Sequence, residues 1–129
     1  MGIATILRIC ATLHILMMVG LYLSIMGGSW LPDGASANHT ATAEILAIMI
    51  LSHAIGVGVI LGLASTLKDV ASARVVLLGE IIFATCMLGA FIFANLQDSW
   101  YDGPPIPVLA MIVVCLLLST YGRLKVTRM

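Results

Sequence analysis

The sequence predicts an all-α integral membrane protein: a four-helix bundle with up-down-up-down topology and both termini on the cytoplasmic, inner side. The first observation is composition. Apolar residues make up 61% of the 129 residues, charged residues make up 9%, and the mean hydropathy is +1.15. A soluble domain usually carries about 25% charged residues. The second observation is that the apolar residues fall in four runs long enough to cross a bilayer.

The third observation is the distribution of charge, which predicts the orientation. Lys and Arg in short loops stay on the side from which the chain is inserted. With four spans, all six basic residues would lie on that side: Arg8, Lys68, Arg74, Arg123, Lys125 and Arg128. The two links on the other side carry Asp33, Asp98 and Asp102 and no basic residue. We therefore expect a multi-pass membrane protein. The formal net charge is zero, so nothing supports a nucleic-acid partner.

The first span should cover residues 3–26 and end at Gly27-Gly28. We expect an uncleaved anchor, because the apolar run is longer than a typical signal core and no small-x-small cleavage pattern follows it. The second span should cover residues 42–66. Thr40 or Thr42 is a suitable N-cap, with Glu44 in the first turn, where the helix dipole favours a negative charge.

The third span should cover residues 71–96, after a tight inner link. The fourth should begin at Pro107, where a missing N–H costs little, and should cover residues 107–122. Because short links make consecutive helices antiparallel neighbours, residues 1–129 should form one transmembrane domain.

Three acidic, basic or histidine side chains lie deep inside the predicted spans, away from their ends: His14, His53 and Glu80. Such residues are costly in lipid, so they usually turn inward and are candidates for function. His14 follows Arg8 by six residues and Glu80 follows Arg74 by six. At ~1.5 Å per residue, both lie about 9 Å from the inner boundary. His53 should lie about 10 Å further out.

Two interpretations of the His14 and Glu80 pair remain open. As a buried acid–base pair, they could pass protons or hold a polar head group such as that of a quinone. Alternatively, Glu80 is neutral, or paired with Arg8 or Arg74, and ties the helices together.

His14 and His53 could also be axial ligands of haem b or a chlorin, since imidazole commonly ligates haem iron. Their offset in depth opposes this unless helix tilt reduces it. The alternative is that each ring bonds to a facing backbone or hydroxyl group.

A stripe of small residues on the second span predicts close helix packing. Its members recur at helical spacing and include a G-x-x-x-G motif: Ala47, Ala54, Gly58, Gly62 and Ser65. We favour a contact within the chain over a docking face for another subunit.

Cys10, Cys86 and Cys115 lack metal-type spacing, so the sequence predicts no metal site, and we interpret them as buried thiols that pack as small hydrophobes. The scattered methionines are interpreted as adaptable packing residues. They include Met17, Met18, Met26, Met49, Met87 and Met111.

The size and four-span layout, with Arg8 near the entry to the first span and Arg74 ahead of the third, resemble the DoxX-like group of small four-helix membrane proteins. The resemblance assigns no functional residue. Because no catalytic motif is present, we expect a non-catalytic accessory or structural subunit whose partners are the lipid bilayer and other membrane subunits or itself. Two alternatives are a redox or quinone-associated subunit that uses the embedded histidines, and an oligomeric proton-coupled transporter.

Overall fold

The computed structural model describes residues 1–27, 34–97 and 106–129. These residues form four helices and no strand: α1 (Ile3–Gly27), α2 (Ala37–Ala64), α3 (Val70–Leu96) and α4 (Ile106–Lys125). Each helix is long and apolar enough to cross a membrane. The all-α class and the four candidate spans are therefore confirmed. The acidic side chains expected in the two outer links, Asp33, Asp98 and Asp102, lie outside the described residues.

The start of α2 differs from the prediction. The helix begins at Ala37, before residue 42, and its N-cap is Ser36, whose hydroxyl accepts a hydrogen bond from the His39 N–H at 3.3 Å. The expected caps Thr40 and Thr42 are wrong, because both lie within the helix. Thr40 instead donates its hydroxyl to the Ser36 carbonyl at 3.3 Å. Glu44 consequently lies beyond the first turn, which contains no acidic residue.

The end of α4 also differs. The helix continues past Gly122 to Lys125, with Arg123 and Lys125 in its last turn, where the helix dipole favours positive charge. Gly122 does not end the helix because it is buried at a contact, where a Cβ would meet the Cδ1 atoms of Ile6 and Leu77.

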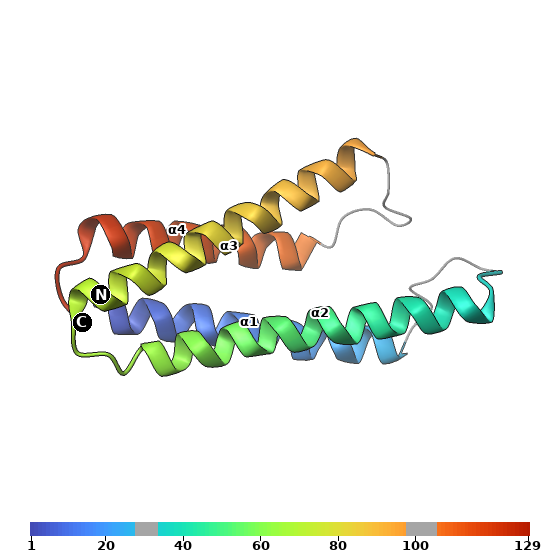
Figure 1. The fold of residues 1–129 in the computed structure, drawn as a ribbon, viewed down its shortest axis with the longest axis horizontal. Coiled ribbons are helices and arrows are strands. Elements are labelled where there is room, and N and C mark those ends of the chain that lie inside the picture. The colour runs from blue at the N-terminus through green and yellow to red at the C-terminus, as the bar shows by residue number, and fades with distance from the viewer. Residues whose placement is uncertain (28–33, 98–105) are drawn as a thin grey trace.

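The helices are arranged as two pairs, α1 with α2 and α3 with α4, and α1 also packs against α4. Figure 1 shows that both chain termini lie at the same end of the bundle, and that α3 diverges from the other helices toward Leu96. The Ile3 N–H donates to the Arg128 carbonyl at 3.0 Å, which joins the two ends of the chain.

The best-packed part of the core lies near these joined ends. It consists of the largest fully buried side chains: Ile3, Ile6, Leu7, Cys10, His14, Leu77, Ile112, Cys115 and Ser119. In contrast, α2 and α3 expose large apolar side chains over much of their length. This distribution is expected when lipid or another helix covers the outer surface.

Candidate functional site

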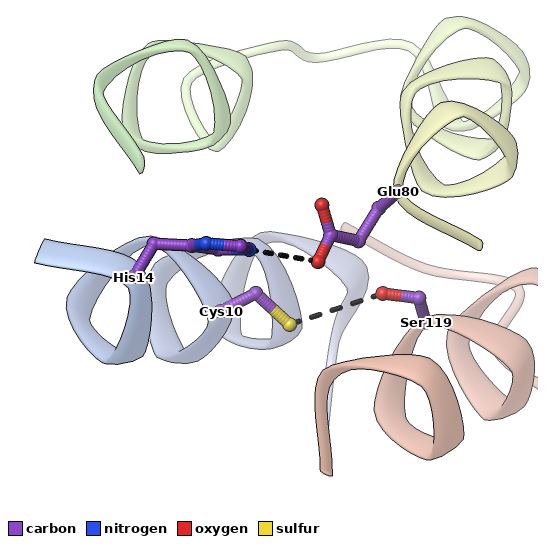
Figure 2. A network of polar contacts seen from close by, with 4 residues as sticks. All are labelled: Cys10, His14, Glu80 and Ser119. Atoms are coloured by element: carbon purple, nitrogen blue, oxygen red, sulfur yellow. Dashed lines mark hydrogen bonds and ion pairs between the residues drawn. The ribbon is translucent and has the colours of Figure 1, made fainter. Parts of the chain in front are cut away.

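A buried hydrogen bond joins α1 to α3. The Nε2 atom of His14 lies 3.0 Å from Oε1 of Glu80, and the two side chains are 2% and 1% exposed. Figure 2 shows both side chains pointing into the space between the helices. The bond forms whichever partner holds the proton. Sequence reasoning predicted that these residues lie at the same depth, and the structure brings them into contact.

Helical periodicity places both residues on inward faces. On α1, His14 continues a buried stripe that includes Leu7, Cys10 and Met18. On α3, Glu80 lies one turn from each of Leu77 and Ala84, which are also buried. The surrounding side chains therefore exclude solvent from the pair, and an unsatisfied polar group would be costly there.

The arginines proposed as partners of Glu80 are engaged elsewhere. Arg8 donates from Nε to the Ser65 hydroxyl at 3.3 Å. Arg74 donates to the Val126 carbonyl at 2.9 Å. Within the described part of the chain, Glu80 forms its ion-pair contact with His14 alone.

Two cysteines lie beside the pair. Cys10 on α1 is 3.8 Å from the Ser119 hydroxyl on α4 (Figure 2). Donor atoms of His14, Glu80 and Cys115 all lie within 4.8 Å of one another, and all three residues are buried. Sequence reasoning missed this cluster because its members come from three helices and share no local spacing. The expectation of buried thiols is confirmed for Cys10 and Cys115 but wrong for Cys86, which faces outward from α3.

His53 has a different environment. Its side chain is exposed, and Nδ1 bonds to the carbonyl of Met49, one turn earlier in α2, at 2.7 Å. His53 and His14 nevertheless line the same cavity, of about 510 Å³. For both rings to ligate one haem, His14 would have to give up its bond to Glu80 or use Nδ1.

The wall of this cavity is almost entirely apolar and comes from all four helices. Besides the two histidines it includes Met18, Met49, Met87, Met111, Phe83 and Phe91. The Phe83 ring lies 5.7 Å from the His14 ring, centroid to centroid. His14 Nδ1 is buried, and among the described residues it has no hydrogen-bond partner. The methionines interpreted as packing residues thus include four that line a cavity.

The small-residue stripe of α2 lies against α1 where its glycines occur. A Cβ on Gly58 would lie 3.0 Å from the Ala11 carbonyl oxygen, and one on Gly62 would lie 3.8 Å from Ala11 Cβ. Ala54, Gly58 and Ser65 are buried, and Ala47 is partly buried. The stripe therefore forms part of a close α1–α2 contact within the chain.

The polar residues near the joined termini bond to backbone groups. Arg123 donates to the Arg74 carbonyl at 2.7 Å. In the link before α3, the Asp69 carboxylate is the N-cap and accepts hydrogen bonds from the N–H groups of Ala71 and Ser72. A further bond from the Ser72 hydroxyl, with these two, lowers the pKa of Asp69 below its ordinary value.

No protein-family model, curated protein or solved structure matches this chain. Its function must therefore be inferred from its own residues and their geometry.

Proposed function

We propose that this chain is a small, non-catalytic integral membrane protein that serves as an accessory or structural subunit, packed against other membrane proteins or copies of itself. One observation carries the proposal: the interior polar side chains join helices of the same chain, whereas the outward surface is apolar. His14 bonds to Glu80, and Cys10 contacts Ser119. Outward side chains such as Ile60 and Leu63 are more than 60% exposed.

The outward surface of α2 and α3 is suited to lipid and to neighbouring helices. These two helices make little contact with each other, so each has a long apolar face free for another partner. The described link between α2 and α3, residues 65–69, is too short to form a catalytic domain.

The proposed orientation is up-down-up-down with both termini on the cytoplasmic side. It is supported by the grouping of Arg8, Arg74 and Arg123 near the joined termini, since basic residues mark the inner side. Labelling of introduced cysteines tests it in a Cys86→Ser background. Lys68→Cys should react from the cytoplasmic side and Gly34→Cys from the opposite side. Labelling of both from one side would contradict the topology.

The subunit role is tested by the mass of the particle in lipid nanodiscs prepared from native membranes. We expect a mass well above that of the 13.6 kDa chain plus lipid. Leu63→Trp on α2 should reduce assembly if this face meets a partner. Leu16→Trp is the matched control on α1, because the two leucines are 67% and 65% exposed. A uniform monomer would contradict the proposal.

A second candidate function is the binding of a lipophilic redox molecule, either a quinone or a haem b or chlorin ring. The cavity supports it, because about 510 Å³ lies within the ~300–1,000 Å³ range of ligand pockets and the wall holds two histidines. His14 Nδ1 has no hydrogen-bond partner among the described residues, so it is a suitable contact for a quinone oxygen.

An absorption spectrum in mild detergent separates these ligands. Haem would give a Soret band that His53→Ala removes, whereas a bound quinone would appear in an organic extract of the purified protein. His39→Ala is the control, because that exposed histidine bonds to the N-cap Ser36 and does not line the cavity. A colourless protein with no extractable lipophile would exclude this function.

The third candidate is an oligomeric proton-coupled transporter that uses Glu80. Its support is the burial of a carboxyl group within a span, a position typical of proton relays. Proton uptake into liposomes that is the same for the wild type and Glu80→Gln would exclude it.

A further inference from the structure

We propose that His14, Glu80 and Cys115 form a binding site for a divalent transition-metal ion of the zinc class. The three residues come from α1, α3 and α4, and their donor atoms lie within 4.8 Å of one another. All three are buried. The site goes beyond the proposed subunit role and does not depend on it.

The distances suit a shared ion. Zinc binds imidazole nitrogen and carboxylate oxygen at about 2.0–2.2 Å and thiolate sulfur at about 2.3 Å. In a tetrahedral site, such donors lie about 3–4 Å from one another. His14 Nε2 and Glu80 Oε1 already lie 3.0 Å apart. Only a small movement of side chains is needed to bring Cys115 to the same ion.

The charges also suit a buried site. A divalent cation bound by one thiolate, one carboxylate and one neutral imidazole forms a complex with no net charge. A neutral complex avoids the cost of placing an isolated ion among apolar groups. Binding requires the Cys115 thiol to lose its proton to water. The proton of the His14–Glu80 hydrogen bond must also leave Nε2 and Oε1, and it moves to His14 Nδ1 or to water. Metal uptake should therefore release at least one proton.

The chemistry of the donors favours zinc over magnesium or calcium. Those ions bind oxygen ligands, whereas a thiolate with an imidazole is typical of zinc. Cys10 contacts Ser119 and is not one of the three residues whose donor atoms lie within 4.8 Å of one another, so it remains a thiol outside the metal site. A bound ion would join α1, α3 and α4 where the two helix pairs meet.

Cobalt(II) is the probe for this site, because it replaces zinc and gives a thiolate-to-metal charge-transfer band. The purified protein in mild detergent, with its thiols reduced and metals removed by a chelator, is titrated with Co²⁺. We expect the band to reach its maximum at one equivalent and to disappear when Zn²⁺ is added. Cys115→Ser should remove the band. Cys86→Ser is the matched control and should keep it, because that thiol lies outside the cluster.

Each outcome decides the proposal. A wild-type protein that gives no charge-transfer band at one equivalent of Co²⁺ would overturn it. So would a band that persists in Cys115→Ser or that is lost in Cys86→Ser. Circular dichroism and gel filtration check that each variant is folded. If Cys115→Ser does not fold, Cys115→Ala takes its place. Glu80→Gln, which keeps all three thiols, should then weaken Co²⁺ binding.

Discussion

Replacing Gly58 by Ala should weaken the contact between α1 and α2. A Cβ at this position would lie 2.7 Å from Ile15 Cγ1, 3.0 Å from the Ala11 carbonyl oxygen and 3.3 Å from His14 Cβ. The carbonyl oxygen belongs to the α1 backbone, so it cannot turn away as a side chain can. The two helices must therefore move apart, and the displaced α1 carries His14.

The expected change in the free energy of unfolding for Gly58→Ala follows from two opposing effects. Extra atoms in a packed interior usually cost about 1–3 kcal/mol. Alanine in place of glycine inside a helix returns up to about 1 kcal/mol through its higher helix propensity. Gly56 provides the matched control on the same helix, because a Cβ there would meet nothing within 4 Å. Gly56→Ala should show only the gain in stability that comes from the higher helix propensity of alanine. Gly58→Ala and Gly56→Ala should therefore differ by about 1–3 kcal/mol in free energy of unfolding.

The assay is equilibrium unfolding in mixed micelles, with helix content followed by circular dichroism as the fraction of denaturing detergent rises. Gly122→Ala should be less harmful than Gly58→Ala. Its Cβ would meet the Cδ1 atoms of Ile6 at 2.8 Å and Leu77 at 2.9 Å, and these flexible ends can move. If Gly58→Ala were as stable as Gly56→Ala, the close α1–α2 contact would be refuted.

Three further predictions concern the polar residues. A double-mutant cycle with His14→Ala and Glu80→Ala should give a coupling energy of about 0.6–1.7 kcal/mol, as for other polar contacts between membrane helices; zero coupling would show that the buried bond contributes nothing. The pKa of Asp69 is lowered in the folded state from its ordinary value of 3.8. The stabilising effect of this carboxylate is therefore present above pH 3.8 and is lost as the pH falls through the lower, folded pKa. The wild type should therefore lose stability over that acidic window and Asp69→Asn should not, and superimposable acid-unfolding curves would contradict this. Ser36→Ala should destabilise the start of α2 by about 1 kcal/mol, which should be measured as faster amide hydrogen exchange in the first turn. Thr40→Ala is the control and should change this exchange little. Equal exchange rates in the two variants would argue against the Ser36 cap.

The helices could be predicted from the sequence because crossing a bilayer requires a long apolar run. Such a run can be recognised from the residue types alone, without knowledge of how the helices pack. The start of α2 could not be predicted in the same way. Residues 37–41 are too polar to extend the predicted span, yet they are helical because Ser36 satisfies a free N–H beyond the apolar run. The length of a span and the length of its helix are set by different interactions.

The candidate site was predicted only in part, for a related reason. Counting residues from the basic positions gives depth, and depth correctly placed His14 level with Glu80. Depth does not tell which way a side chain points around the helix axis, or how far apart two helix axes lie. Cys86 and Cys115 illustrate this limit, because both lie within apolar runs and only the packing of the helices turns one outward and the other toward His14.

His14 lies where two parts of the bundle with different properties meet. Toward the joined termini, the chain has its closest packing and the polar contacts of Glu80, Cys10 and Ser119. Away from the termini, α3 diverges (Figure 1) and the apolar cavity extends toward Phe91. One nitrogen of His14 bonds to Glu80, and its other nitrogen has no partner among the described residues. A ligand in the cavity and an ion at the His14–Glu80–Cys115 cluster would therefore act on the same ring, so occupation of one site should alter affinity at the other.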